Sequence, residues 1–221
     1  MLARAIPEPR CELDHDGPWQ LLVATILSAQ CTDERVNATT PALFRRWPTP
    51  EALGAAPLAE VEQAVRSTGF YRNKARAIVA ASREVALRFG GEVPRTIEEA
   101  TTLPGVARKT ANLVLGTGLG IAAGMVVDTH VGRVARRLGL ATGDSPEMVE
   151  RELCALFPRD AWIDGGHRLL LHGRYVCVAR KPRCAACPLA EACPSAESAP
   201  EGSRRAREAA EARLVASRGD G

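Results

Sequence analysis

Four cysteines in one short segment constrain this chain more than any other feature. They stand in CVARKPRCAACPLAEAC, residues 177–193, with six, two and five residues between successive cysteines. Thiolates bind soft metals, and four of them on one segment can surround a zinc ion or hold the corners of an iron–sulfur cluster. The pattern therefore predicts a metal-binding loop, but its spacing does not separate zinc from iron.

The remaining cysteines indicate the cellular compartment. Cys11, Cys31 and Cys154 are scattered along the chain, unlike the evenly paired cysteines of a small secreted domain. The first residues, MLARAIPEPR, lack the apolar centre of a signal peptide, and the longest apolar runs are far too short to cross a bilayer. We therefore expect a soluble cytoplasmic protein without membrane contact. We also expect it to be a monomer.

Helical periodicity predicts an all-α fold. Aromatic residues make up only 4% of the chain, and the apolar residues are mostly Ala, Leu and Val, which favours helices packed through small side chains. Apolar spacing, capping residues and helix-ending glycines predict helices at residues 18–30, 33–46, from 50, 57–67, 70–89, 97–102, 130–137, 146–157 and 161–175. In the first of these, Gln30 stands where an apolar residue is expected, either as a satisfied amide at a helix end or as a polar probe facing a site.

A glycine turn between two helices is the second informative segment. In LPGVARKTA, residues 103–111, a tight turn exposes backbone N–H groups at a helix start, where a phosphate oxygen can bind. An ordinary corner between two helices is the alternative. Residues 108–183 hold twelve Lys and Arg against seven Asp and Glu, which suits a polyanionic partner, although a solvated surface of mixed charge explains this balance as well.

An acidic residue follows a short apolar run. In VVDTH, residues 126–130, Asp128 stands at a predicted helix start, where capping the helix is the commonest role of such a residue.

These segments together resemble the endonuclease III family, the DNA glycosylases and abasic-site lyases of the helix–hairpin–helix superfamily. LPGVARKTA, VVDTH and HGRYVCVARKPRC carry the resemblance, with LLVATILSAQCTDERVN and TGFYRNKA upstream, over about residues 11–194. It implies a six-helix barrel domain at 11–121, with the helix–hairpin–helix at about 97–117, and an iron–sulfur cluster domain made of 1–10 and 122–194. A DNA-binding groove is expected between them. Residues 195–221 are expected to be a flexible tail, within which 203–216 could form a marginal helix.

The resemblance also assigns roles to individual residues. It decides for iron over zinc and implies a [4Fe–4S] cluster held by Cys177, Cys184, Cys187 and Cys193. It implies that Lys109 is the nucleophile, forming an imine with the sugar, and that Asp128 stabilises positive charge or assists proton transfers. The residues expected to contact DNA are Gln30, Phe70, Gly105, Ala107, Arg108, Lys181 and Arg183.

Some of these contacts have alternatives. Phe70 is expected to fill the gap left by a turned-out base, with packing in the core as the other reading. Lys181 and Arg183 would contact phosphates or would simply keep the loop soluble. Ala107 departs from the family pattern, which has a second glycine there.

The expected function is that of a bifunctional DNA glycosylase and abasic-site lyase acting on oxidised or ring-saturated pyrimidines in duplex DNA. The partner is then damaged double-stranded DNA. A non-catalytic DNA-binding module that senses damage is the alternative from another class. A zinc-dependent DNA-binding regulator is a third, and it would be colourless.

Overall fold

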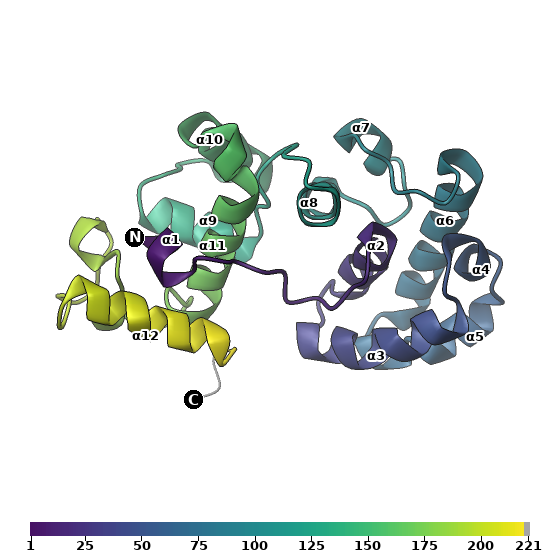
Figure 1. Ribbon diagram of the computed structural model, residues 1–221, viewed down its shortest axis with the longest axis horizontal. Coiled ribbons are helices and arrows are strands. Elements are labelled where there is room, and N and C mark those ends of the chain that lie inside the picture. The colour runs from purple at the N-terminus through teal and green to yellow at the C-terminus, as the bar shows by residue number, and fades with distance from the viewer. Residues whose placement is uncertain (219–221) are drawn as a thin grey trace. The chain divides into compact units, whose positions relative to one another are not determined.

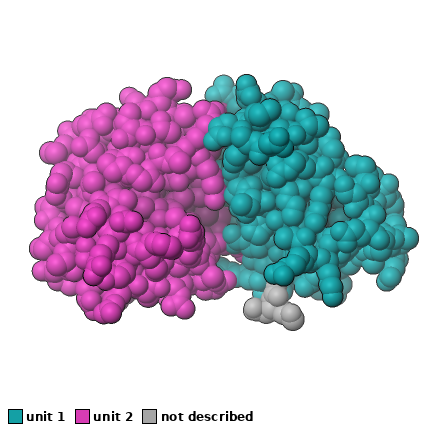
Figure 2. Space-filling view, turned by 180° about the vertical axis from the view of Figure 1, so that it is seen from behind, with its two compact units in different colours: residues 1–10, 124–221 teal, residues 11–123 magenta. Residues whose placement is uncertain are grey.

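The computed structural model describes residues 1–218, and every regular element within this range is helical (Figure 1). The predicted all-α class is therefore confirmed. Two compact units divide the chain, one of residues 11–123 and one of residues 1–10 with the chain from Gly124 onward (Figure 2). Among the described helices, none combines the length and apolar character needed to cross a bilayer.

The unit of residues 11–123 contains seven α-helices. They are α2 Pro18–Leu27, α3 Asp33–Arg46, α4 Pro50–Gly54, α5 Leu58–Ala64, α6 Tyr71–Phe89, α7 Ile97–Ala100 and α8 Arg108–Leu113. Threonine side chains cap α3, α4 and α7 by accepting a backbone N–H of the first turn, and the sequence predicts the caps of α4 and α7. After α8 the helix widens into one π-helical turn, Val114–Gly118.

Helix α2 forms the centre of this unit. It contacts α3, α6 and α8 (Figure 1), and eight of its ten residues are buried. Its Trp19 donates a hydrogen bond of 3.0 Å to the buried Ser82 Oγ and packs against Phe44. The predicted helix 18–30 is too long, because it ends at Leu27. Gln30 lies in the next turn with φ 52°, a left-handed conformation that a right-handed helix cannot contain.

The second unit is built from five α-helices within the described chain. They are α1 Leu2–Ala5, α9 Thr129–Arg137, α10 Pro146–Leu156, α11 Trp162–Tyr175 and α12 Arg204–Ala216. Gly173 allows α11 to pack closely on α9, because a Cβ atom there would lie 2.9 Å from Val134 Cγ2 and 3.0 Å from His130 Cβ. Helix α11 delivers the chain into the cysteine loop, defined here as residues 177–193.

The flexible tail expected at 195–221 is wrong over residues 204–216, where the marginal helix allowed at 203–216 forms as α12. Helix α12 occupies part of it and packs against α1 and α11. The buried face of α12 carries Arg207, Glu208 and Glu211, so the apolar periodicity that normally predicts a packed helix is absent. Residues 219–221 of the expected tail lie outside the described residues. Identifying the two units as a barrel domain and a cluster domain stays a prediction.

Candidate functional site

The turn before α8 presents Lys109. Leu103 and Val106 are buried, and the Val106 N–H donates to the Leu103 carbonyl at 3.1 Å, which closes the turn. Gly105 has φ +77°, and a Cβ atom there would lie 2.9 Å from the Ala77 Cβ. Only glycine meets both conditions. The turn therefore holds the start of α8 against the core while Lys109, at its second position, stays exposed.

The residues on either side of this turn are also exposed. Ala107 occupies the N-cap position of α8, without a capping side chain. Its backbone has φ −92° and ψ 170°, an extended conformation that any residue can adopt. Alanine thus fits the position where the family pattern has glycine. Arg108 follows it at the first helical position and is exposed as well.

Asp128 caps helix α9. Its Oδ1 accepts the N–H groups of His130 and Val131 at 2.8 and 2.9 Å, so the capping role expected of this residue is confirmed. Its Oδ2 makes no hydrogen bond with the residues that the structure describes. The cap orients the half-buried carboxylate and leaves one oxygen for chemistry. Lys109 and Asp128 come from different units.

Gln30 and Phe70 share an uncommon backbone conformation. Both are exposed, and both have positive φ, 52° and 45°. Such a backbone costs about 1–2 kcal/mol outside glycine and occurs preferentially at functional sites. Phe70 is 67% exposed, which rules out core packing as its role.

A buried lysine that sequence reasoning missed supports the Phe70 turn. The Lys74 side chain is buried, and its Nζ donates to the Thr68 carbonyl at 2.6 Å. Burial lowers the pKa of Lys74, while the charge that Cys31 can carry opposes this shift. The sequence shows a lysine four residues after Phe70 on the predicted helix. An exposed helical lysine would give the same pattern, so the burial of Lys74 could not be predicted.

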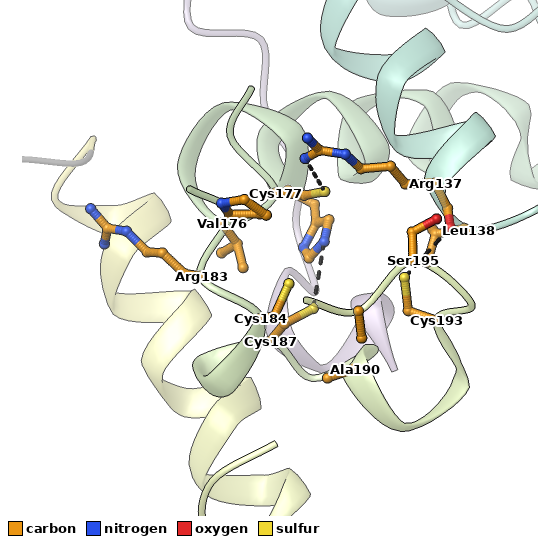
Figure 3. A pocket seen from close by; sticks show the side chains of 13 residues that line it. Arg137, Leu138, Val176, Cys177, Arg183, Cys184, Cys187, Ala190, Cys193 and Ser195 are labelled. Atoms are coloured by element: carbon orange, nitrogen blue, oxygen red, sulfur yellow. Dashed lines mark hydrogen bonds between the residues drawn. The ribbon is translucent and has the colours of Figure 1, made fainter. Parts of the chain in front are cut away.

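The four cysteines of the cysteine loop line one cavity (Figure 3). Backbone N–H groups of Leu189 and Glu197 donate to Cys187 Sγ and Cys184 Sγ, each at 3.4 Å. Figure 3 also shows the Arg183 side chain extending away from the cavity. Within residues 1–218, no three His, Cys, Asp or Glu side chains meet closely enough to hold a single metal ion.

Two cationic side chains act on the sulfur atoms. Arg137 Nη1 donates to Cys177 Sγ at 3.4 Å, and His172 Nε2 lies 3.8 Å from Cys187 Sγ. Although burial alone would raise it, the pKa of Cys177 is lowered because His172 and Arg137 stabilise the thiolate. Burial raises the pKa of Cys193. Thiolates are the metal-binding form, so the surroundings of Cys177 favour a bound metal.

Helix α9 connects the Asp128 cap with the cysteine loop, through residues that sequence reasoning missed. Arg133 donates to the carbonyls of Cys177 and Gly173 at 3.1 and 2.7 Å. One turn later, Arg137 donates to the carbonyls of Val178 and Ala179 at 2.8 and 3.0 Å. These are the first two residues after Cys177. Arg133 and Arg137 stand four residues apart, which places them on one face of the helix and was the available sign of a shared role. Arginines on a helix usually face solvent, so this role was not predicted.

The basic tip of the cysteine loop is exposed. Lys181 has φ 55°, and Pro182 separates it from Arg183. The Arg183 N–H donates to the Val176 carbonyl at 3.0 Å, which closes the tip into a turn. Lys181 and Arg183 thus stand on a constrained backbone with their side chains in solvent.

Known proteins match most of the chain. A family model described as HhH-GPD superfamily base excision DNA repair protein matches residues 23–159. The endonuclease III of Synechocystis sp. is 53% identical over 190 residues, 86% of this chain and 87% of that protein. The Bacillus subtilis endonuclease III is 48% identical over 184 residues, 83% and 84% of the two chains. A solved structure of a trapped endonuclease III–DNA covalent intermediate, an estranged-adenine complex, superimposes with a TM-score of 0.84 at 44% identity and covers 89% of this chain and 92% of its own.

Proposed function

The chain belongs to the endonuclease III family of the HhH-GPD superfamily of base excision DNA repair proteins, and we propose that it is a bifunctional DNA glycosylase and abasic-site lyase. Its substrates are oxidised or ring-saturated pyrimidines in duplex DNA. The observation that carries this proposal is an exposed lysine, Lys109, at a helix start held by a turn that only glycine can make. A covalent DNA intermediate is known for a protein 44% identical to this chain.

The reaction follows from the chemistry of a lysine amine. The neutral Nζ of Lys109 attacks C1′ of the damaged nucleotide, the N-glycosidic bond breaks, and the base leaves with the bonding electrons. Ring opening yields an imine between Lys109 and C1′. The imine acidifies the C2′ proton, whose removal expels the 3′ phosphate and cuts the strand. Hydrolysis of the imine then frees the lysine.

Asp128 supplies the carboxylate for this sequence. The helix cap fixes Oδ1 through two N–H donors, so Oδ2 is the atom that we assign to catalysis. A fixed negative charge stabilises the positive charge that develops on the sugar as the base departs. The same oxygen can accept or return a proton in the later steps.

Seven residues are assigned to DNA contacts. The backbone around Gly105 and Ala107 offers N–H groups to a phosphate, and Arg108, Lys181 and Arg183 supply positive charge. When the damaged nucleotide turns out of the stack, a gap remains in the duplex. We assign Phe70 to stack within that gap and Gln30 to probe the base left unpaired. Their exposure and their left-handed backbone support this assignment.

A [4Fe–4S] cluster fits the cysteine loop. Each iron takes one thiolate, so four sulfur atoms should surround a volume, as Cys177, Cys184, Cys187 and Cys193 do around their common cavity. Hydrogen-bond donors reach three of the four sulfur atoms, which stabilises thiolate ligands. With all four irons held by protein, the cluster would supply structural order to the basic tip and would take no part in the reaction. A DNA substrate would place the enzyme with the genome, in the cytoplasm of a bacterium.

Product analysis on a defined lesion tests this function. A duplex with one thymine glycol should lose the free base and be cut to a fragment ending in a 3′ unsaturated aldehyde. We expect Lys109→Gln to lower both activities by about 10³-fold or more while binding to the duplex remains. A protein that binds damaged duplex but releases no base and cuts no strand would be the non-catalytic module instead.

A further inference from the structure

Helix α12 buries ionisable side chains against the rest of its unit. Arg207 is 3% exposed, Glu208 6% and Glu211 0%. A buried charge is strongly unfavourable unless a partner compensates it. The partners of these three side chains therefore indicate what α12 holds in place.

Glu211 reaches the cysteine loop through His172. Its Oε1 lies 2.7 Å from His172 Nδ1, and both side chains are at most 1% exposed. The opposite ring nitrogen of His172, Nε2, lies 3.8 Å from Cys187 Sγ. A hydrogen bond to Nδ1 fixes the orientation of an imidazole ring. Glu211 thus determines how His172 faces the sulfur.

Arg207 reaches the same cysteine by a second route. Its Nε donates to the Cys187 carbonyl at 3.0 Å, and its Nη2 binds Glu191 Oε1, also in the cysteine loop. Its Nη1 donates to the carbonyl of Gly202, just before α12. One planar guanidinium therefore ties the Cys187 backbone to Glu191 further along the loop and to the chain just before α12.

The cysteine loop needs such ties. Its regular structure consists of two 3-10 turns of three residues, Cys184–Ala186 and Ala190–Ala192, which are too short to hold their own geometry. Helix α9 anchors the Cys177 end through Arg133 and Arg137. At the Cys187 end, the buried polar contacts come from His172 and Arg207.

We infer that α12 is a clamp on the cysteine loop, in which Arg207 and Glu211 are positioning residues for Cys187 as a ligand of the proposed cluster. This inference rests on the proposed function for the identity of the ligand, whereas the clamp itself rests on the contacts of α12. Loss of either side chain frees Cys187, so iron leaves the loop sooner. Loss of Glu211 also changes, through His172, the hydrogen bonding at the Cys187 sulfur, which tunes a cluster.

A set of matched variants tests the clamp. Arg207→Ala and Glu211→Ala remove the two ties, and Glu211→Gln keeps an oxygen that can accept from Nδ1. Glu208→Ala is the control, because Glu208 is a buried carboxylate of the same helix that pairs with Arg4 at 2.8 Å and has no bond to the cysteine loop. The full-length proteins are compared by their visible iron–sulfur absorbance per chain and its decay under an iron chelator. The reduction potential and the thermal unfolding midpoint are measured alongside.

The clamp predicts a difference between these variants. Arg207→Ala and Glu211→Ala should lose the absorbance roughly 10-fold faster than the native protein, and Glu211→Ala should shift the potential. Glu211→Gln should recover most of the native lifetime. Glu208→Ala should lower the unfolding midpoint with a native lifetime and potential. Equal lifetimes for Glu211→Ala and Glu208→Ala would overturn the inference, because α12 would then act only through general stability.

Hydrogen exchange separates this inference from the proposed cofactor. Backbone amides of the cysteine loop should exchange faster in Arg207→Ala and Glu211→Ala than in Glu208→Ala, with or without metal. A native protein that carries no iron would overturn the assignment of the cluster. The exchange rates of the variants would still test whether α12 holds the cysteine loop. Unchanged exchange in Arg207→Ala and Glu211→Ala would overturn the clamp even in an iron-loaded protein.

Discussion

At the scale of single residues, Asp128 combines a structural and a chemical role on its two oxygens. Oδ1 caps α9, and Oδ2 is assigned to catalysis. Asparagine keeps an oxygen that can cap the helix but carries no charge. The two roles can therefore be separated by substitution.

We predict that Asp128→Asn lowers single-turnover base release by about 10²–10⁴-fold and changes the free energy of unfolding by only a few tenths of a kcal/mol. Asp128→Ala should lower base release by a similar factor, and it should also lower the free energy of unfolding by about 1 kcal/mol. Ser145→Ala, which removes the cap of α10, is the matched control and should lose stability alone. Base release and urea unfolding measured on the three variants check this. Native activity in Asp128→Asn would contradict the catalytic role.

Phe70 is the second residue whose role can be isolated. A stacking wedge contributes about 1–3 kcal/mol of binding, or roughly 5–150-fold, so Phe70→Ala should weaken binding to a duplex with an abasic site by this range. Leu87→Ala, which truncates the 76% exposed Leu87 on the helix that follows Phe70, should bind as the native protein does. Fluorescence anisotropy on both variants gives the comparison. An equal effect of the two substitutions would contradict the wedge.

The site residues differ in how far the sequence reveals them. Lys109 and the four cysteines stand in distinctive motifs, so the sequence alone is enough to propose their roles. Lys74, Arg133 and Arg137 carry no such signal, because a lysine that binds a buried carbonyl and arginines that anchor a loop have the same sequence pattern as solvated residues. Their roles depend on contacts with distant segments, which local patterns do not encode.

At the scale of elements, the turn before α8 depends on Gly105 for two separate reasons. Its φ is +77°, and a Cβ atom would overlap Ala77. Gly120 shares the first property, with φ +68°, but has open space around it.

Gly105→Ala should therefore destabilise the protein by about 1–3 kcal/mol more than Gly120→Ala, because overlap in a packed region adds to the backbone strain. The shifted turn should also weaken DNA binding and slow base release. Urea unfolding and activity assays of both variants measure these effects. Equal destabilisation by the two substitutions would mean that the turn can move away from α6 without cost.

Most helices were predictable because their signals are local. Threonine or serine caps mark α4, α7 and α10 in the sequence itself, and the structure confirms them. The end of α2 was misplaced because Gln30 adopts a left-handed turn. Helix α12 could be predicted only as a marginal helix at 203–216, because its buried face is ionic and so resembles a solvated helix.

At the scale of the whole molecule, the two units have separate apolar cores. One core lies entirely within residues 11–123, and two smaller clusters stabilise the other unit. Loss of metal from the cysteine loop should therefore loosen one unit and leave the other folded.

We predict that Cys184→Ser lowers the iron content, speeds amide exchange throughout the cysteine loop, and weakens DNA binding through the basic tip. Exchange in α2 and α6 should stay slow. Cys154→Ser, in the same unit but outside the loop, is the control and should keep its iron. Iron analysis with hydrogen-exchange mass spectrometry measures both. Fast exchange in α2 of Cys184→Ser would show that the units do not fold separately.

Lys109 as the nucleophile is the central assignment for this enzyme, and borohydride trapping tests it most directly. The native protein, incubated with abasic-site duplex and reduced, should form a covalent adduct that peptide mapping places on Lys109. Lys109→Gln should form none while it still binds the duplex. An adduct mapped to another amine, such as the amino terminus, or an adduct that survives in Lys109→Gln, would contradict the central claim.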